Sequence, residues 1–371
     1  MKIMMIAAGD SIHAVRWANV FIDKGHDVDF VTLANHRPGI DSFSERVKLY
    51  YLKHRGSKGY YLNALELHRI WKRISPDVVN VHYASGYGML ARLAGLRKTV
   101  LSVWGSDVYE FPYKNKIANR IVTKNLKGAD AIASTSKCME AQVEKLIGAA
   151  SKPIIITPFG VDVNQFCPSE KDSYSNEKKE FTFGIVKKLT YKYGIDYVIK
   201  AYAILLDRYM ELEDKKLPFP KLFICGKGEN KGDFEKLRDK LGLHDYVTIK
   251  GYIPHDKIPD VIRSIDVFCL GSNDSESFGV AAVEAMACGI PIVATDADGF
   301  KEVMVDGYTG YIVPRKDEKA MADKMWELYL DADKRREFGM NGRQHVLKNY
   351  SWDDNVSTLV TLLEEVSKKG D

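Results

Sequence analysis

The sequence has few cysteines and no long hydrophobic run. Its 371 residues include five Cys, and none has the Cys-x-x-Cys spacing of a redox motif or a zinc site. Cys225 and Cys269 lie in apolar, strand-like runs, so we expect reduced, mostly buried thiols, as in a cytoplasmic protein. No stretch approaches the length of a membrane-spanning helix. The first ten residues have no signal-peptide layout and are typical of a buried strand.

Metal-binding patterns are also scarce. The nine His show no paired spacing of the kind that holds zinc. Two Asp-x-Asp strings occur, at Asp27 and Asp29 and at Asp296 and Asp298. Strand alternation places the first pair on one solvated face, and the second pair lies in a polar turn. We therefore expect no metal site and no cofactor, and no nucleic-acid recognition motif accompanies the basic residues.

The charge is small overall but unevenly distributed. The net charge is +4, yet residues 1–165 contain 23 Lys and Arg against 14 Asp and Glu, while residues 166–371 contain 31 against 36. Ordinary scatter is one explanation. The other is that the first half faces an anionic partner, such as a lipid phosphate or a membrane surface.

Apolar strand-like runs and helical patterns alternate along both halves of the chain. Such alternation predicts parallel sheets with crossover helices, so we expect an α/β protein of two doubly wound, Rossmann-like domains that face each other across a cleft. The strands are expected at residues 2–7, 27–33, 78–82, 99–103, 130–134, 154–157, 181–186, 222–226, 247–251, 265–270 and 292–294.

Four segments follow from this pattern. Residues 1–165 form the first domain and residues 181–350 the second. Residues 166–180 between them are polar and nearly free of aliphatic side chains, which is typical of a linker. Residues 351–371 contain apolar positions at helical spacing, which predicts a C-terminal helix.

Two glutamates, Glu276 and Glu284, flank the start of an apolar helix between two predicted strands. Open α/β sheets bind ligands at the carboxyl ends of their strands, and the first N–H groups of a helix attract anions. Ionised carboxylates accept hydrogen bonds from hydroxyl groups. The pair therefore suits a ligand with both hydroxyls and phosphates, such as a nucleotide sugar; a buried helix with two incidental glutamates is the alternative.

The pattern Glu-x-Phe-Gly-x4-Glu-Ala-Met-Ala-x-Gly-x-Pro resembles the E-x7-E signature of family-4 retaining glycosyltransferases, which have the two-domain GT-B fold. Shorter similarities occur at residues 8–10, 158–162, 222–228 and 299–310. The resemblance implies transfer from a UDP- or GDP-type nucleotide sugar to a glycan or lipid-linked acceptor, in surface polysaccharide or lipopolysaccharide biosynthesis. It also implies that the C-terminal helix returns to the first domain.

The resemblance assigns the donor-binding residues. Glu276 would accept hydrogen bonds from donor-sugar hydroxyls, and Glu284 would bind the ribose hydroxyls. The backbone around Ser277, Phe278 and Gly279 would face the diphosphate. Two further glycines, Gly9 and Gly226, end predicted strands, and Gly9 would let the backbone approach the donor closely.

A pair of lysines is expected to stabilise the leaving phosphate without a metal. Cleavage of a sugar–diphosphate bond places negative charge on that phosphate, and fixed cations lower the barrier. In the family, the Arg and Lys of Gly-Arg-Leu-x3-Lys-Gly do this; here Lys188 stands at the Arg position and Tyr193 at the Lys position. We expect Lys188 and Lys192 to form the clamp, although lysine lacks arginine's bidentate fork. A solvated basic turn is the alternative.

Trp104 occupies a position where many family members have a histidine that contacts the donor sugar. This difference suggests a donor that lacks a 6-hydroxyl or binds it differently; a tryptophan that only packs in the cleft wall is the alternative. With Trp104 we assign His13 and Asp107 to the donor-sugar or acceptor side.

Residues 113–127 form a basic amphipathic pattern that fits either a peripheral membrane contact or an ordinary surface helix. Two other functions stay open at this point. One is a non-catalytic nucleotide-sugar-binding protein, and the other is a nucleotide-sugar epimerase on the same fold.

Overall fold

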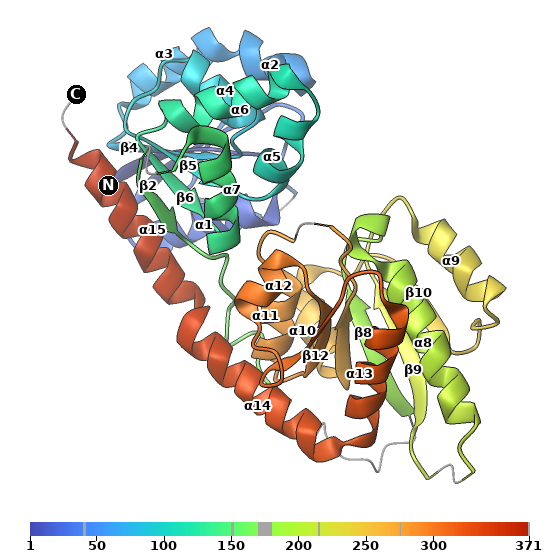
Figure 1. The fold of residues 1–371 in the computed structure, drawn as a ribbon. Helices are drawn as coiled ribbons and strands as arrows, with labels where there is room; N and C mark the ends of the chain where they lie inside the picture. The colour runs from blue at the N-terminus through green and yellow to red at the C-terminus, as the bar shows by residue number, and fades with distance from the viewer. Residues whose placement is uncertain (40–41, 150–151, 170–179, 214–215, 275, 370–371) are drawn as a thin grey trace. The chain divides into compact units, whose positions relative to one another are not determined.

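The chain folds into two compact units in the computed structural model (Figure 1). Unit 1 comprises Met1–Pro158 and Asp354–Asp371, and unit 2 comprises Phe159–Asp353. Most of the expected linker, residues 170–179, lies outside the described residues, and the expected domain limits stay predictions. The structure describes residues 1–39, 42–149, 152–169, 180–213, 216–274 and 276–369.

Unit 1 is built on a seven-stranded parallel sheet in the order β3-β2-β1-β4-β5-β6-β7. The order reverses between β1 and β4, whose register places Met4 beside Val79. The described strands are β1 (Lys2–Ile6), β2 (Asp27–Leu33), β3 (Lys48–Leu52), β4 (Val78–His82), β5 (Thr99–Val103), β6 (Ala131–Ser134) and β7 (Ile154–Ile156).

The central strands β4 and β5 of unit 1 are buried along their whole length because helices cover the sheet, which explains why most of their residues are apolar. The helices that connect the strands are α1 (Ile12–Asp23), α2 (Gly56–Leu62), α3 (Ala64–Ile74), α4 (Gly86–Leu93), α5 (Ser106–Tyr109), α6 (Lys116–Gly128) and α7 (Lys137–Ile147).

Unit 2 has a six-stranded parallel sheet in the order β10-β9-β8-β11-β12-β13. Here the order reverses between β8 and β11, where Val267 pairs with Phe183. The strands are β8 (Glu180–Val186), β9 (Phe219–Cys225), β10 (Val247–Lys250), β11 (Val267–Leu270), β12 (Ile292–Thr295) and β13 (Gly310–Val313).

The helices of unit 2 pack on this sheet, and α8 and α13 supply most of the helical side chains of its largest apolar core. The helices are α8 (Ile195–Met210), α9 (Lys231–Lys240), α10 (Ile258–Arg263), α11 (Val280–Ala287), α12 (Asp298–Val303), α13 (Glu318–Leu330) and α14 (Ala332–Asn349). The two Rossmann-like sheets confirm the predicted fold class, although β3 and β13 were not predicted.

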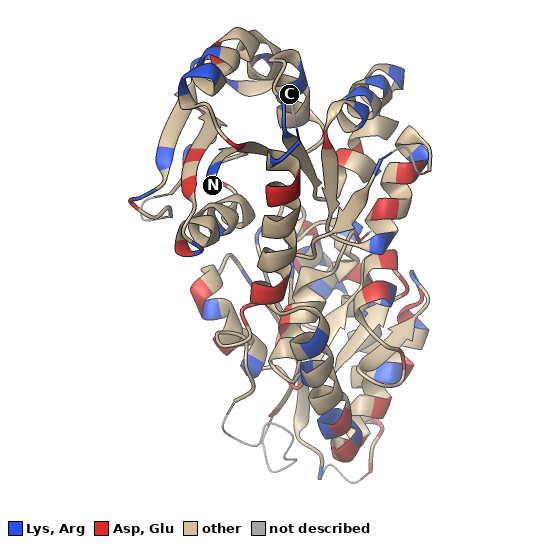
Figure 2. Ribbon diagram, turned by 90° about the vertical axis from the view of Figure 1, so that its left-hand side faces the viewer, with Lys and Arg blue, Asp and Glu red and all other residues tan. Residues whose placement is uncertain are grey.

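The last helix, α15 (Trp352–Ser367), buries the apolar positions that its helical spacing predicts. From Asp354 onward it belongs to unit 1, where the Lys369 ammonium donates a hydrogen bond to the carbonyl of Asp130. Basic and acidic residues are interspersed along the helices of both units (Figure 2). None of the described helices has the length and apolar character needed to cross a membrane.

Candidate functional site

The strongest candidate site in unit 2 lies where its strand order reverses. The loops after β8 and β11 begin at neighbouring strands, because β8 and β11 pair in the middle of the sheet. Such a reversal opens a crevice at the carboxyl ends of the two strands, and open sheets bind ligands there. Three predicted residues, Lys188, Lys192 and Glu276, lie in these two loops.

Glu276 is mostly buried and pairs with a lysine that the sequence analysis did not assign. Its Oε2 lies 2.9 Å from Nζ of Lys187, and the two side chains are 10% and 13% exposed. Ser272 Oγ donates a second hydrogen bond to the same oxygen at 3.2 Å. Thr295 in turn donates to the Ser272 carbonyl, which ties the loop to the end of β12.

The ring of Tyr193 holds two ammonium groups. Nζ of Lys187 lies 4.7 Å from its centroid and Nζ of Lys192 lies 5.8 Å away, both within the range of a cation–π contact. The Asn273 backbone N–H donates to the carbonyl of Lys192, and its side chain donates to the carbonyl of Tyr191. These bonds join the loop after β8 to the loop after β11.

Lys188 points in a different direction from Lys187 and Lys192. Its ammonium pairs with Glu229 at 3.7 Å, and its side chain is 60% exposed. The structure therefore brings Lys187 and Lys192 together around Tyr193, close to Glu276, and does not bring Lys188 to that pair. The role of Lys188 in the clamp stays a prediction.

Glu284 lies on α11, about one turn into the helix, and a histidine contacts it. Nε2 of His255 is 3.2 Å from Oε1 of Glu284, and the Glu284 side chain is only 12% exposed. The His255 ring also contacts the buried ring of Phe166. The histidine thus fixes the direction of one of the two signature carboxylates.

The backbone that leads into α11 is tightly constrained. Gly279 has a φ of 91°, a left-handed conformation that favours glycine at this N-terminal position. Phe278 is buried against Phe159 and Tyr350, so its ring belongs to the core and only its backbone can face a ligand. Ser277, the next predicted residue, is half-buried between Glu276 and Phe278.

Close backbone packing explains why glycine stands at positions 226 and 299. A Cβ on Gly226 would lie 1.8 Å from the carbonyl oxygen of Lys187, because the ends of β8 and β9 approach closely there. A Cβ on Gly299 would lie 2.6 Å from the carbonyl of Glu276, which accepts a hydrogen bond from the Gly299 N–H. Both glycines therefore position the loops that hold Lys187 and Glu276.

Unit 1 carries an aromatic group at its own strand-order reversal, between β1 and β4. Trp104, after β5, contacts the rings of His13, His82 and Tyr83 at centroid distances of 5.8, 4.5 and 5.6 Å. Tyr83 has a φ of 73°, which is strained for a non-glycine residue and sets the direction of its ring. We call these four residues the aromatic group.

His82 is the buried member of the aromatic group, with 1% of its surface exposed. Burial lowers the pKa of His82 to about 3, so the ring is neutral. Asn80 donates its amide to Ser102 Oγ and accepts a hydrogen bond from Nε2 of His82 at 2.6 Å, which leaves Nδ1 as an acceptor. This Nδ1 has no hydrogen-bond partner among the described residues.

The structure gives Asp107 and Gly9 clear structural roles. Asp107 accepts hydrogen bonds from the backbone N–H groups of Ala84, Trp104 and Gly105, so it fixes the loop that presents Trp104. Burial raises the pKa of Asp107, and these backbone bonds oppose the increase. A Cβ on Gly9 would lie 2.7 Å from the carbonyl of His36, so close packing requires a glycine there.

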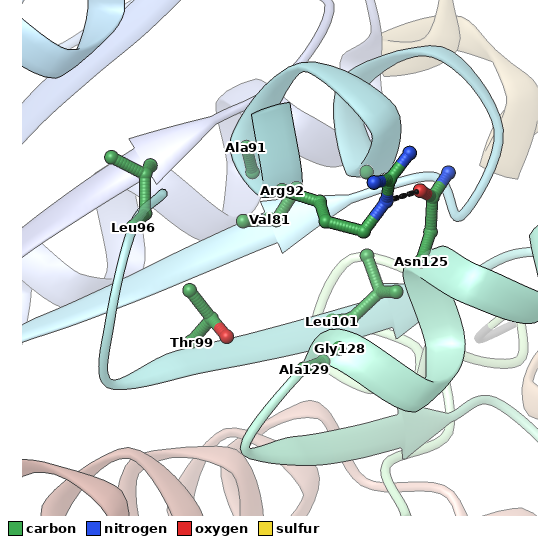
Figure 3. A pocket seen from close by; sticks show the side chains of 10 residues that line it. Val81, Ala91, Arg92, Leu96, Thr99, Leu101, Asn125, Gly128 and Ala129 are labelled. Atoms are coloured by element: carbon green, nitrogen blue, oxygen red, sulfur yellow. Dashed lines mark hydrogen bonds between the residues drawn. The ribbon is translucent and has the colours of Figure 1, made fainter. Parts of the chain in front are cut away.

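A small cavity in unit 1 is lined by residues of β4, β5, α4 and α6 (Figure 3). Arg92 and Asn125 close one side, where Nε of Arg92 donates to the Asn125 amide oxygen at 2.7 Å. The amide of Asn125 donates to the carbonyl of Ala84, the residue that Asp107 also holds. The cavity volume of about 20 Å³ suits a single water rather than a sugar, so the cavity is no substrate site.

Sequence reasoning missed four residues of the two sites. His82 and Tyr83 follow a predicted strand, and the strand-end rule could have identified them. Lys187 adjoins the predicted clamp but gave no signal of its own, because strand ends alone do not show which of two adjacent lysines turns inward. His255 comes from the loop after β10, and nothing in its local sequence connects it with Glu284.

Comparison with known families agrees with this geometry. Residues 168–345 match the model of glycosyl transferases group 1, and residues 2–136 match a glycosyl transferase 4-like model. Together the two models cover both units. The chain belongs to the family-4 glycosyltransferases that these two models describe. It is therefore an enzyme, and its family favours a glycosyltransferase over the two alternatives left open above, a non-catalytic binding protein and an epimerase.

Several curated glycosyltransferases are similar to this one over most of its length. A phosphatidyl-myo-inositol mannosyltransferase of Mycolicibacterium smegmatis is 26% identical over 98% of this chain and 92% of the relative. A GDP-mannose-dependent phosphatidylinositol monomannoside mannosyltransferase of the same organism is 27% identical over 74% and 72%. A D-inositol 3-phosphate glycosyltransferase of Corynebacterium urealyticum is 26% identical over 78% and 71%.

Solved structures of other glycosyltransferases share the fold of the whole chain. A sucrose-phosphate synthase from Thermosynechococcus elongatus has a TM-score of 0.82 at 18% identity, covering 99% of both chains. HepE of Anabaena, solved in complex with UDP, has a TM-score of 0.80 at 16% identity and covers 98% of this chain and all of its own. This likeness places the two Rossmann-like sheets in the GT-B fold.

Proposed function

We propose that the enzyme transfers a sugar from a UDP- or GDP-type nucleotide sugar to a glycan or lipid-linked acceptor, with retention of the anomeric configuration and without a metal. The observation that carries this proposal is the pair Glu276 and Glu284 on either side of the start of α11. The pair offers acceptors for hydroxyl groups beside the free N–H groups of a helix N-terminus, which attract phosphate.

The two carboxylates take different parts of the donor. Glu276 accepts hydrogen bonds from the sugar hydroxyls, since it lies at the strand-order reversal beside the lysines. Glu284, which His255 orients, accepts those of the ribose. The backbone from Ser277 to Gly279 faces the diphosphate between them. This arrangement matches the order of groups along a nucleotide sugar: sugar, diphosphate, ribose.

The transfer breaks the bond between C1 of the sugar and the phosphate oxygen. The electron pair of that bond goes to the phosphate, and the acceptor oxygen forms a new bond to C1 on the same face. The leaving phosphate takes the acceptor's proton, and the products are the glycoside and a nucleoside diphosphate. Fixed ammonium groups favour this step because they stabilise the charge that develops on the leaving phosphate.

The acceptor side is assigned to the aromatic group of unit 1, which contains the predicted residues His13 and Trp104. Aromatic faces and a buried, neutral histidine suit a ring with apolar C–H faces and hydroxyl edges. Asp107 acts there by positioning the Trp104 loop. The names of the relatives, which act on phosphatidylinositol and inositol phosphate, favour an acceptor of that kind over the surface polysaccharide or lipopolysaccharide pathway that the resemblance implies.

Peripheral membrane contact fits the exposed surface of α6. Tyr113 and Ile117 are large apolar residues that stand exposed, and Lys116, Arg120 and Lys124 are exposed on the same helix or at its start. The buried face of α6 uses other positions, among them Val122 and Leu126. Sedimentation with vesicles of anionic and of neutral lipid tests this contact. Binding that requires anionic lipid and weakens with salt supports it, and equal sedimentation with both kinds of vesicle contradicts it.

The donor is identified by binding and by turnover. UDP- and GDP-sugars are screened by thermal shift, because a ligand that binds only the folded state raises the melting temperature. The best donor is then incubated with phosphatidylinositol or inositol phosphate, and the anomeric configuration of the product is read by NMR. A product of the same configuration as the donor supports the proposal. Absence of nucleotide-sugar binding, or an inverted product, refutes it.

A further inference from the structure

The ammonium group of Lys187 links the loops that follow the two central strands of unit 2, β8 and β11. Lys187 is the first residue after β8, and its Nζ contacts Oε2 of Glu276 at 2.9 Å. The same Nζ lies 4.7 Å from the centroid of the Tyr193 ring. The family pattern quoted above has a glycine at position 187 and a lysine at 193, so neither residue takes its role from the resemblance.

Stability alone is a weak reason for this ion pair. Both side chains are largely removed from water, and the loss of hydration offsets most of the attraction between buried charges. The contact with Tyr193 is independent of the carboxylate, because an aromatic face attracts a cation by itself. The ammonium can therefore leave Glu276 for another anion while the Tyr193 ring still holds it.

The donor poses a charge problem that Lys187 solves. The proposed function brings a diphosphate close to Glu276, and two anions repel strongly where little water screens them. An ammonium between the two anions turns this repulsion into attraction. Lys188 pairs with Glu229 instead and is 60% exposed, and Lys192 lies 5.8 Å from the shared ring against 4.7 Å for Lys187.

We propose that Lys187 is the catalytic cation that binds the leaving phosphate, and that Tyr193 positions it. This assignment rests on the proposed function. In the free enzyme the ammonium is held by Glu276. With the donor bound, sugar hydroxyls donate to Glu276 and Lys187 donates to a phosphate oxygen. Lys187 keeps its own protons throughout, since the acceptor's proton goes to the leaving phosphate.

The decisive measurement is the affinity for a nucleoside diphosphate relative to that for its nucleoside. Calorimetry with UDP and uridine, and with GDP and guanosine, gives this ratio for the wild-type enzyme. In Lys187→Ala the ratio falls by about 10- to 100-fold, the value of a charge-assisted hydrogen bond to phosphate. A structural role would weaken both ligands equally, because the nucleoside has no phosphate, and an unchanged ratio overturns the proposal.

The chain supplies a matched control in Lys324 of α13. Its Nζ lies 2.8 Å from Oε2 of Glu327 and 4.3 Å from the ring of Tyr311, so it has the same kinds of partner as Lys187. Lys324→Ala removes an ion pair and a cation–π contact of the same kinds at a more exposed place, and it leaves the diphosphate-to-nucleoside ratio at the wild-type value. An equal fall in both variants overturns the proposal.

Lys187→Ala also leaves Glu276 without its cation, so it can lower the yield of folded protein. The double variant Lys187→Met with Glu276→Gln removes both charges and keeps similar volume, and its ratio should still fall. In turnover, kcat of Lys187→Ala falls by about 100- to 1,000-fold, and added ethylamine restores part of it. Lys188→Ala is the competing assignment: a larger fall there than in Lys187→Ala overturns the proposal.

The outcomes separate this inference from the proposed function. If the wild-type enzyme binds no nucleoside diphosphate more tightly than its nucleoside and transfers no sugar, the proposed function fails and this inference fails with it. If the wild-type enzyme transfers sugar but Lys187→Ala keeps the wild-type ratio, only the assignment of Lys187 is wrong.

Discussion

Unit 2 contains two clusters in which lysine, glutamate and tyrosine meet, and they differ in what surrounds them. In the strand-end cluster, Lys187 contacts Glu276 and Tyr193. In the helix cluster, Lys324 and Lys334 contact Glu327, and Tyr311 donates its hydroxyl to the same carboxylate. Both clusters combine an ion pair with a cation–π contact, so composition alone does not distinguish them.

The helix cluster is complete by itself. Lys324 binds Oε2 of Glu327 and Lys334 binds Oε1, so both carboxylate oxygens have a cation. Its side chains are about a third exposed, and water is available to each. In the strand-end cluster both bonds from Lys187 and Ser272 converge on one oxygen, Oε2 of Glu276, at the edge where the sheet binds ligands. The position of a cluster at a strand end therefore indicates function better than its residue types do.

After the Lys187 and Lys324 variants, neutralising Glu276 and Glu327 gives the largest expected difference between the two clusters. Glu276→Gln keeps the shape of the side chain but loses the charge that accepts sugar hydroxyls and holds Lys187. We expect kcat/KM to fall by about 100-fold, the cost of losing a hydrogen bond to a charged group and its preorganisation. Glu327→Gln should stay within about twofold of wild type. Steady-state kinetics on the identified donor measures both.

A similar loss in Glu327→Gln would mean that the two clusters do not differ in function. Equal melting temperatures of the folded variants then serve as the check that the Glu276→Gln loss is chemical. If that loss instead follows a large drop in melting temperature, the ion pair is structural.

Replacing His255 tests whether Glu284 has a different role from Glu276, and replacing His244 serves as the control. His255→Ala frees Glu284, so donor KM should rise by about 5- to 10-fold with little change in kcat. The affinities for UDP and uridine, or for GDP and guanosine, should fall by the same factor, because both ligands of each pair carry the ribose. The matched variant is His244→Ala, which removes an exposed contact with Asp239 at the same 3.2 Å distance and should have no effect. A loss confined to the diphosphate would refute the ribose assignment.

The two tyrosines separate the ring from the hydroxyl. Tyr193→Leu removes the face that holds Lys187, and kcat should fall by about 10-fold, within the range of a desolvated cation–π contact. Tyr193→Phe keeps that face and should lose clearly less. Tyr311→Leu removes the corresponding ring of the helix cluster and should lower the melting temperature without changing kcat. Equal kinetic losses in the Phe and Leu variants at position 193 would show that the hydroxyl, not the ring, matters.

The sequence predicted most of the fold because the buried strands carry their own signal. Continuous apolar runs such as residues 3–6 in β1 and Val267–Leu270 in β11 are fully buried, so their pattern depends little on their neighbours. By contrast, β3 (Lys48–Leu52) is partly exposed and lies at the edge of its sheet, where the apolar pattern is weaker. It was missed for that reason.

Only those residues of the candidate site that lie at predicted strand ends or in the local motif could be predicted from the sequence. Glu276 and Glu284 lie in one continuous segment, so their spacing alone places both beside α11. Lys187 and Lys188 are adjacent, and only the three-dimensional structure shows that the first turns toward Glu276 and the second toward Glu229. The same holds for His255, whose partner lies on another element far along the chain.

The smallest expected effect is the response of the helix cluster to acid. Burial alone would raise the pKa of Glu327, but hydrogen bonds from Lys324, Lys334 and Tyr311 outweigh it and hold the pKa at about 2. A depressed pKa in the folded state stabilises the fold above the unfolded value of 4.5, and this contribution is lost as the pH falls toward 2. Melting temperatures of wild type and Glu327→Gln should therefore converge between pH 4.5 and 2, whereas they stay apart at pH 7. Because both cations and the carboxylate are partly exposed, added salt should narrow the gap at pH 7. A gap that is independent of pH would show that the cluster stabilises the helices through packing rather than through charge, and the contrast with the strand-end cluster would then rest on geometry alone.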